Sequence, residues 1–325
     1  MNTTNKINIT TIGWGNGSYW LLSSIRDNDN YNISAIISMS DSGGSTWVLR
    51  EEFGILPPGD VRRAVLALSR EHDVIKQLFS YRFDKDSTIS GHSLWNLMIA
   101  AMADLTWDFD KWLKQISKLL KVRWRVIPVT LGLSHLNVEL ENWDIIEWET
   151  KIDLELNENS SPIKKAYLTP EVEGNPRAIK AIEKSDVIIL SFWDVYTSVI
   201  PNLLCKWIKE AIANNKNAKV IYFVNLMTKP GETTDFEAIK FIDTIEKYLW
   251  KDILTHVVVN NWFINEKLAQ KYKSLEKKKP VKIKDLKHFE AKSYEIIETD
   301  LLHENDWVRH SFDKIAGIIE KIVKK

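Results

Sequence analysis

A glycine-rich turn near the start of the chain has the residue types that bind phosphate groups. It spans residues 13–17 and lies between an apolar segment typical of a strand, residues 6–12, and an apolar segment of helical character. Backbone N–H groups at such a turn can approach an anion closely, and the positive end of the helix dipole favours negative charge there. A tight strand-to-helix turn without a ligand is the alternative. The candidate phosphate-binding residues are Gly13, Gly15, Asn16 and Gly17.

Three further polar loops follow predicted strands, and each carries groups that could bind a ligand. They span residues 40–46, 191–198 and 225–233. Ligands of parallel sheets bind at the C-terminal ends of the strands, where the strand order reverses, so these loops could meet at one site. Ordinary turn and capping chemistry is the alternative for each loop taken alone. The candidate binding residues in these loops are Asp41, Gly43, Gly44, Tyr196, Thr197, Ser198, Asn225 and Thr228.

Other catalytic signatures are sparse in the sequence. No His and Cys residues have zinc-binding spacing, no glycine-rich loop ends in the lysine of a P-loop, and no serine has the surroundings of a hydrolase nucleophile. His92 follows Gly91 at the start of a predicted helix, where it could act in acid–base catalysis or serve only in capping and packing. The sequence therefore indicates no required metal or cofactor.

The charge balance gives no reason to expect nucleic acid as a partner. The chain has 44 basic and 44 acidic residues and a formal net charge of zero, so it lacks the positive potential that attracts nucleic acid or an anionic membrane. No apolar run approaches the ~20 residues that span a bilayer. Residues 1–6 lack the charged and apolar regions of a signal peptide. We therefore expect a cytoplasmic protein.

Apolar strands that alternate with helices predict the framework for these loops. Expected strands cover residues 6–12, 31–39, 186–191, 219–225 and 255–260, and helical patterns occur between them. This alternation is typical of an α/β fold with a Rossmann-like, mostly parallel sheet and helices on both faces. No clear linker divides the chain, so residues 1–325 are expected to form a single domain.

Two regions depart from this alternation. Residues 122–170 contain alternating, β-branched segments, including 122–130 and 144–157, which predict an antiparallel β-rich insertion. Residues 265–325 are expected to form a helical tail with a solvated, lysine-rich stretch. In the first half of the chain, a helix is expected after Pro57 with Asp60 as its N-cap.

Longer sequence blocks resemble the gluconeogenesis-factor (YvcK/CofD-like) family. Residues 40–60 resemble its DSGGS-x-G-x-LR…LPPGD signature, and residues 91–96 are similar to its GHSLGN. Residues 194–204 resemble the second part of GPGSLYTSVIPNLL, and residues 225–233 resemble NLMTQPGET with Lys229 in place of Gln. These blocks run in family order over most of the chain.

The resemblance implies a cytosolic regulatory protein that binds UDP-sugars such as UDP-N-acetylglucosamine, is needed for cell shape on gluconeogenic carbon and has no established reaction. The alternative that it implies is a 2-phospho-lactate transferase, which transfers a phospholactyl group from a guanylated donor to a deazaflavin and uses Mg²⁺. In that case Asp41 would contact Mg²⁺ and His92 would be the acid–base group. A nicotinamide-dependent dehydrogenase, with Asp41 at the ribose, agrees less well with these blocks.

The C-terminal part of the chain carries a further motif of this resemblance. Residues 308–310 resemble a VRH motif, although Ser311 and Phe312 stand where Asp and Thr are expected. In sugar-nucleotide-binding members a tyrosine and an arginine of this part contribute to the site, and Tyr272 and Arg309 are the matching positions. A homo-oligomer is compatible with the resemblance.

The tryptophan content departs from that of the family. The chain has 14 Trp and only 12 Gly. At residue 143, an Asn-Gly pair would make a conventional hairpin turn after Asn142, because both positions need positive φ, but Trp143 stands there. One hypothesis is that the source reads UGA as glycine; a divergent, tryptophan-rich member is the alternative. The tryptophans that replace a family glycine are Trp14, Trp47, Trp95, Trp107, Trp124, Trp193 and Trp207.

Overall fold

The computed structural model describes residues 6–42, 56–69, 73–83, 90–106, 108–157, 159–283, 293–303 and 307–324. Its strands are β1 (Ile7–Ile12), β2 (Tyr31–Ile37), β3 (Arg125–Pro128), β4 (His135–Leu140), β5 (Ile145–Glu147), β6 (Ile163–Thr169), β7 (Val187–Leu190), β8 (Lys219–Phe223), β9 (His256–Asn260) and β10 (Glu295–Thr299). Its helices are α1 (Gly15–Ile25), α3 (Pro58–Leu68), α4 (Asp73–Ser80), α5 (Leu94–Thr106), α6 (Phe109–Leu119), α7 (Glu149–Glu155), α8 (Pro176–Glu183), the π-helical turn η1 (Val195–Val199), α9 (Ile200–Leu204), α10 (Ile208–Asn214), α11 (Ala238–Leu249), α12 (Glu266–Glu276) and α13 (Phe312–Lys324).

Seven strands form the main sheet, in the order β10-β9-β8-β7-β1-β2-β3. Every neighbouring pair in this sheet is parallel. After β1 the chain adds β2 and then β3 on one side of β1. It later adds β7, β8, β9 and β10, in that order, on the other side of β1. The reversal between β1 and β7 is the switch point at which α/β sheets bind ligands. The predicted α/β fold with a mostly parallel sheet is confirmed.

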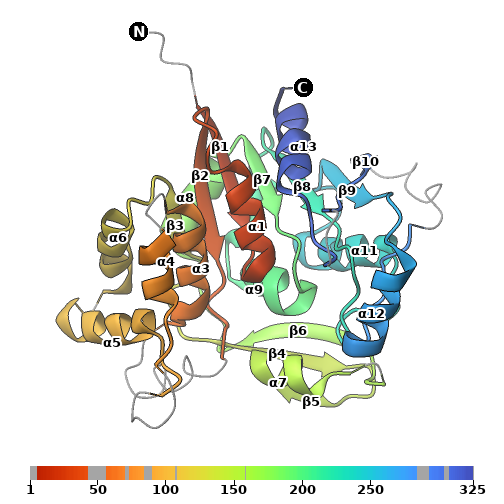
Figure 1. The fold of residues 1–325 in the computed structure, drawn as a ribbon, viewed down its shortest axis with the longest axis horizontal. Coiled ribbons are helices and arrows are strands. Elements are labelled where there is room, and N and C mark those ends of the chain that lie inside the picture. The colour runs from red at the N-terminus through yellow and green to blue at the C-terminus, as the bar shows by residue number, and fades with distance from the viewer. Residues whose placement is uncertain are drawn as a thin grey trace.

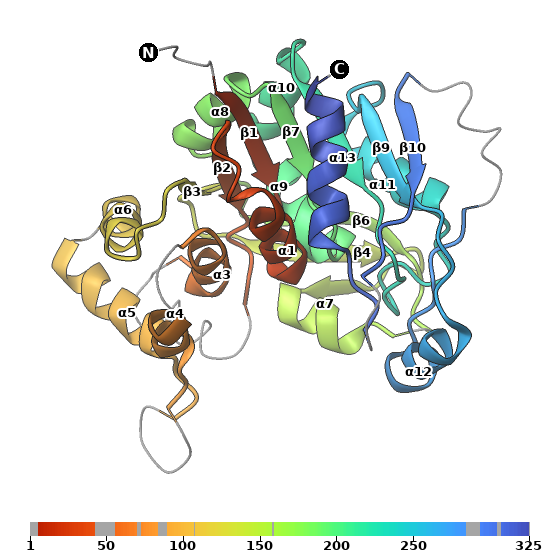
Figure 2. The same cartoon turned by 45° about the horizontal axis from the view of Figure 1, so that its top comes forward.

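Apolar side chains of the main sheet point alternately to its two faces and form two cores. On one face Ile9 packs with α1, α3 and α13, and on the other face Ile12 packs with α8, α10 and α11. Successive strand residues point to opposite faces, so residues three apart lie on different sides. Figures 1 and 2 show α1 and α13 in front of the sheet, with α8 and α11 behind it. In the described part of the chain no helix is both long and apolar enough to cross a membrane.

The antiparallel part of the fold is smaller than the sequence predicts. A three-stranded sheet, in the order β5-β4-β6, lies with α7 at the bottom of the view in Figure 1. Residues 122–130 do not belong to it, because β3 pairs in parallel with β2 at the edge of the main sheet. Residues 149–155 form α7 instead of strands, since Ile152 and Leu156 are four apart and reach the same core.

Two further expectations about local structure need correction. The expected helical tail does contain α12 and α13, but it also contains β10, which extends the main sheet beside β9; the residues of β10 are half-buried or exposed, so they carry little apolar signal. Pro57, not Asp60, is the N-cap of α3. Asp60 lies in the first turn of that helix and accepts a hydrogen bond from Arg63, where the helix dipole favours a negative charge.

Four tryptophans have backbone conformations that side chains rarely adopt. The φ angles of Trp143, Trp148, Trp207 and Trp250 are 73°, 79°, 71° and 80°. They are four of the eight non-glycine residues with positive φ in the described ranges. Trp250, whose ψ angle is 154°, falls in a region that is essentially restricted to glycine. The predicted hairpin is confirmed, since Trp143 lies in the turn between β4 and β5 with positive φ.

Other tryptophans are accommodated by the surrounding core. Trp95 is fully buried on α5 and packs edge-on against Phe79 and Trp112. Trp124 is buried beside Arg123, whose guanidinium lies 4.3 Å from the ring centre. These positions therefore show no backbone strain of the kind seen at the four positive-φ tryptophans. Trp47 and Trp107 lie outside the described residues.

Candidate functional site

A pocket of about 640 Å³ lies at the switch point of the main sheet. Its walls come from the start of α1, from the loops that follow β7 and β8, from α12 and from residues 307–310. This is the place at which the topology predicts a ligand. The lining residues that matter below are Asn16, Gly17, Trp193, Asp194, Asn225, Thr228, Lys229, Tyr272, Lys278, Arg309 and His310.

The start of α1 offers backbone N–H groups to this pocket. Gly17 allows the helix to pack against the chain after β7, because a Cβ there would lie only 1.7 Å from the Phe192 carbonyl oxygen. The N-cap residue Trp14 makes no capping hydrogen bond; its indole Nε1 instead donates to the Thr197 carbonyl oxygen at 2.5 Å. The first N–H groups of α1 are thus free of side-chain capping, as in helix starts that bind anions.

The indole of Trp193 lies over this helix start. A Cβ placed on Gly15 would lie 2.5 Å from the Trp193 ring, and Gly15 itself has a φ of 79°. Trp193 also lines the pocket beside Asn16 and Gly17. Its ring therefore occupies space that an anion would need in order to reach the N–H groups of α1.

Basic side chains line the same pocket. Lys229, Lys278 and Arg309 contribute to its wall, and the Arg309 guanidinium lies 5.2 Å from the centre of the Trp20 ring. The Tyr272 hydroxyl accepts a hydrogen bond from the Val308 amide at 3.3 Å, which ties the segment of Arg309 to α12. Lys229 and Lys278 are ion-paired with carboxylates, so the charge of Arg309 favours an anionic ligand most directly.

Two buried acceptor atoms on pocket residues have no hydrogen-bond partner among the described residues. They are Asn225 Oδ1 and His310 Nε2. Asn225 is oriented by its Nδ2, which donates to the Trp193 carbonyl oxygen at 2.7 Å. Burial lowers the pKa of His310 to about 3, so its ring is neutral, and it stacks at 3.7 Å on Phe192. Buried acceptors without a partner are costly, and a hydroxyl or N–H group of a ligand could supply one.

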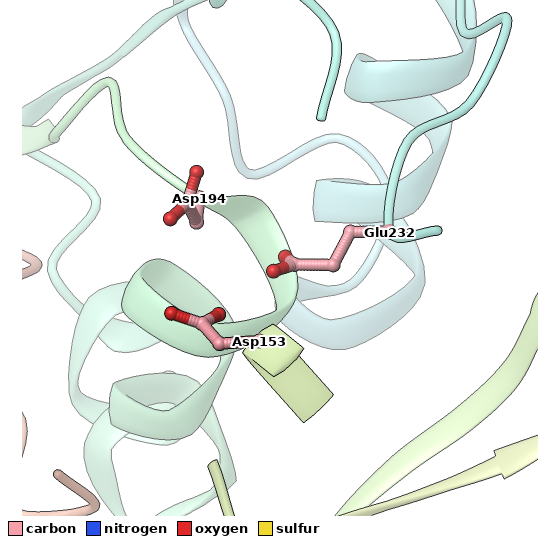
Figure 3. A group of neighbouring side chains, drawn as sticks. All are labelled: Asp153, Asp194 and Glu232. Atoms are coloured by element: carbon pink, nitrogen blue, oxygen red, sulfur yellow. The ribbon is translucent and has the colours of Figure 1, made fainter. Parts of the chain in front are cut away.

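A cluster of carboxylates adjoins the pocket and surrounds one ammonium group. Lys229 Nζ lies 2.5 Å from Asp153 Oδ1, 2.8 Å from Asp194 Oδ2 and 2.5 Å from Glu232 Oε1. The three carboxylates belong to α7, to the N-cap of η1 and to the loop after β8, and Figure 3 shows them as neighbours. Their oxygens lie within 4.8 Å of one another. The cluster joins α7 of the small antiparallel unit to the loops that follow strands β7 and β8 of the main sheet.

Burial and charge shift the pKa values of this cluster in opposite directions. Burial raises the pKa of Glu232 to about 7, although Lys229 acts to lower it, and burial likewise raises the pKa of Asp194. Burial alone would lower the pKa of Lys229, but the three carboxylates raise it above its ordinary value. Lys229 therefore keeps its charge, and within this cluster Glu232 is the carboxyl group whose pKa is raised to about 7.

A second set of acidic residues, Asp41, Asp60 and Glu149, lies near the C-terminal end of β2. Glu149 on α7 accepts a long hydrogen bond, 3.5 Å, from the Ser42 amide, while Asp60 is buried at the start of α3. Burial, together with the charges of Asp153 and Asp41, raises the pKa of Glu149 to about 8. Burial and the charge of Asp41 raise the pKa of Asp60 well above its ordinary range. Asp41 thus belongs to an acidic neighbourhood outside the residues that line the pocket.

The stability of the protein should therefore fall as the pH rises towards 8. The folded-state pKa of Glu149, about 8, exceeds its ordinary value of 4.5, so its contribution to stability is complete below about pH 4.5 and is lost as the pH rises through 8. We expect Glu149→Gln to flatten this decline and to raise the unfolding midpoint at pH 8 by a few degrees. Thermal unfolding between pH 5 and pH 8 measures it, and Glu147→Gln, at an exposed position, is the control. If stability declines equally steeply with pH in Glu149→Gln and in Glu147→Gln, the decline does not come from Glu149.

The comparison with known proteins is consistent with this geometry. The family model of 2-phospho-L-lactate transferase CofD matches residues 9–302. The chain belongs to the CofD family. A gluconeogenesis factor of Bacillus subtilis is 33% identical over 98% of this chain and 99% of its own. A putative gluconeogenesis factor of Clostridium acetobutylicum is 36% identical over 98% of this chain and 70% of its own.

Solved structures of the family have the same fold. A crystal structure of a UPF0052-family protein from Bacillus halodurans superposes on this CofD-family chain with a TM-score of 0.90. It is 34% identical, and the match covers 97% of this chain and 99% of that chain. The resemblance expected from the sequence blocks is therefore confirmed at the level of family and fold.

The structure brings together some of the expected site residues of this CofD-family protein. Six of them line the pocket at the switch point: Asn16, Gly17, Asn225, Thr228, Tyr272 and Arg309. Gly13 and Gly15 belong to the same turn but are covered by Ser191 and Trp193. Gly43 and Gly44 lie outside the described residues.

The other expected residues do not line this pocket. Tyr196, Thr197 and Ser198 are buried in η1, where the Tyr196 ring joins the core and Thr197 contacts Glu232 at 3.4 Å. Asp41 lies in the acidic neighbourhood described above. His92 precedes α5, and it is not among the pocket residues.

Several functional candidates were missed by sequence reasoning. Lys278 lies in the stretch expected to be solvated, yet it lines the pocket. Asp153 lies in a segment that was expected to be a strand, and Lys229 was noted only as a replacement for Gln. His310 stands in the VRH motif, and its unpartnered Nε2 is visible only once the pocket is known.

The Mg²⁺ that a transferase of this family would use does not fit the carboxylate cluster as it stands. The donor set Asp153, Asp194 and Glu232 supplies oxygens of the kind that Mg²⁺ prefers. The ammonium of Lys229, however, lies within 2.8 Å of all three carboxylates, where the ion would have to be. We therefore derive no metal-dependent step at this site.

Proposed function

We propose that this chain is a regulatory protein that binds a nucleotide sugar of the UDP-N-acetylglucosamine type, in the service of cell shape during growth on gluconeogenic carbon. The observation that carries the proposal is the pocket at the switch point, with an uncapped helix start and basic side chains on its wall. Relatives named gluconeogenesis factors support the same reading.

The pocket offers complementary groups for both parts of such a ligand. The diphosphate would bind at the N–H groups of Asn16 and Gly17, with Arg309 and Lys278 supplying positive charge. Donor groups of the sugar or the base would pair with Asn225 Oδ1 and His310 Nε2, which have no partner in the described chain. Tyr272 would hold the segment of Arg309 in place.

Calorimetric titration with UDP-N-acetylglucosamine tests this proposal. We expect saturable binding that Arg309→Ala weakens about tenfold or more, since loss of one charge-assisted contact to a phosphate costs ~1.5–3 kcal/mol. Arg123→Ala is the matched control, because this arginine packs on Trp124 and does not line the pocket. Equal weakening by both substitutions, or no binding by the unsubstituted chain, would contradict the proposal.

A second candidate function is the phospholactyl transfer after which the matching family model is described. This reaction would join a phospholactyl group from a guanylated donor to a deazaflavin acceptor in the presence of Mg²⁺. Incubation with both substrates and chromatography of the deazaflavin distinguish the two functions, because a binding protein returns the nucleotide unchanged. The position of Lys229 among the carboxylates favours the binding protein.

We also infer that some tryptophans of this chain are glycine in the native protein because UGA is read as glycine. The support is conformational: Trp143, Trp148, Trp207 and Trp250 have positive φ, which glycine adopts without strain. Tandem mass spectra of the native protein test this directly. The tryptic peptide of residues 126–151 carries two of these positions, and tryptophan at both would contradict the inference.

A further inference from the structure

The ammonium of Lys229 has the environment of a bound metal ion. Its three N–H donors match the three carboxylates of Asp153, Asp194 and Glu232, each with one oxygen 2.5–2.8 Å from Nζ. The carboxylate oxygens lie within 4.8 Å of one another, a separation suited to ligands of a single small cation. Figure 3 shows the three side chains as close neighbours.

Burial makes this arrangement more than a surface ion pair. Glu232 is 2% exposed, and its second oxygen, Oε2, has no hydrogen-bond partner in the described chain. The side chain of Lys229 is 18% exposed, and those of Asp194 and Asp153 are 23% and 38% exposed, so the cluster is buried at Glu232 and reaches solvent at Asp153. Removing one partner of a buried ion pair is strongly destabilising, which keeps Lys229 in place.

We propose that Lys229 is a tethered cation that takes the place of a divalent metal ion, so that this chain binds its ligand without metal. A divalent ion would have to displace the ammonium from all three carboxylates at once. Lys229 also lines the pocket together with Asp194, so the ion-paired cluster forms part of the pocket wall. The part of this inference that concerns the ligand rests on the proposed function. The part that concerns metal binding can be measured without any ligand.

The position of the carboxylates on the chain supports this reading. Asp153 belongs to α7 of the antiparallel unit, Asp194 follows β7 of the main sheet, and Glu232 follows β8. Unless they take up protons, these three carboxylates need a cation among them, because like charges at this separation repel one another. The lysine meets this need from within the chain, and a neutral residue at position 229 would leave the need to a metal ion.

Manganese binding tests the proposal, with MnCl₂ as the probe and paramagnetic resonance of free Mn²⁺ as the readout. The unsubstituted chain should show no saturable Mn²⁺ binding and no change in its unfolding midpoint on addition of Mn²⁺. Lys229→Gln should bind one Mn²⁺ and gain several degrees in its midpoint when Mn²⁺ is added. Lys278→Gln is the matched control, because Lys278 lines the same pocket but pairs with the exposed Glu276.

Each outcome decides the inference. Saturable Mn²⁺ binding by the unsubstituted chain that Asp153→Asn abolishes would overturn it, as would a folded Lys229→Gln variant that binds no Mn²⁺. If Lys229→Gln folds neither with nor without Mn²⁺, the unsubstituted chain alone decides: saturable Mn²⁺ binding that depends on Asp153 overturns the inference, and its absence supports it. Titration of the unsubstituted chain with UDP-N-acetylglucosamine, once with added Mn²⁺ and once in EDTA, separates the two proposals. If the sugar nucleotide binds in neither condition, the proposed function alone is overturned. If it binds with Mn²⁺ but not in EDTA, the tethered-cation inference is overturned.

Discussion

Replacement of Trp143, Trp148, Trp207 and Trp250 by glycine should stabilise the protein and raise its unfolding midpoint by roughly 5–10 °C. Each of these residues has a φ between 71° and 80°, where a side chain costs about 1–3 kcal/mol of strain. Glycine removes the strain, although its greater freedom in the unfolded chain offsets about 0.5–1 kcal/mol. Thermal unfolding followed by circular dichroism measures the net effect of the fourfold variant.

The side chains lost in this variant offer little compensation. Trp143 is 73% exposed, Trp207 is 56% exposed and Trp250 is 43% exposed, so their loss removes little apolar area from the core, whereas Trp148 is half-buried and its ring centre lies 4.3 Å from that of His135. Lys164 lies 3.4 Å from the Trp143 ring centre and Lys209 lies 4.8 Å from that of Trp250, but exposed cation–π pairs contribute only ~0.5–1 kcal/mol.

The same substitution at a packed helical tryptophan provides the control. Trp112 is buried on α6 between Trp95 and Phe109, so Trp112→Gly should destabilise the protein by about 3–5 kcal/mol. Opposite signs for the two experiments would identify the positive-φ sites as glycine positions. A fourfold variant that is also destabilised would show that the tryptophans belong to the stable fold.

The sequence was sufficient to predict the main sheet because the apolar strands repeat a simple pattern. Ile9, Ile33 and Ile188 stand in short apolar segments separated by helices, which is the pattern of a parallel sheet covered on both faces. The pattern is weaker at the edges. β10 has no buried residue and β3 alternates like an antiparallel strand, so the sequence could not assign either one to the sheet.

The polar interior was much harder to predict than the apolar one. Lys229 meets Asp153 across 76 residues of sequence and Asp194 across 35, and no local spacing rule links such positions. The loops of the switch point were located correctly because each follows a buried strand. Which side chains in them face the pocket depends on η1, whose π-helical turn buries Tyr196, Thr197 and Ser198 and leaves Asp194 at the pocket wall.

Replacement of Trp193 by glycine should increase the affinity for UDP-N-acetylglucosamine by about tenfold or more. The Trp193 ring covers Gly15 and lines the pocket beside Asn16 and Gly17, where the uncapped N–H groups of α1 would meet a phosphate. Recovery of one charge-assisted hydrogen bond, worth ~1.5–3 kcal/mol, corresponds to at least a tenfold change in Kd. The backbone contact of residue 193 with Asn225 Nδ2 does not depend on the side chain and should persist.

Trp207→Gly separates this effect on the pocket from a general gain in stability. Unlike Trp193, Trp207 has positive φ; it is exposed, caps α10 and does not line the pocket, so its replacement should raise the unfolding midpoint without changing Kd. Calorimetric titration of both variants gives the two affinities side by side. If both bind alike, Trp193 does not obstruct the phosphate position. If Trp193→Gly alone binds more tightly, the start of α1 is the diphosphate site, and the indole at 193 is an obstacle that glycine would remove.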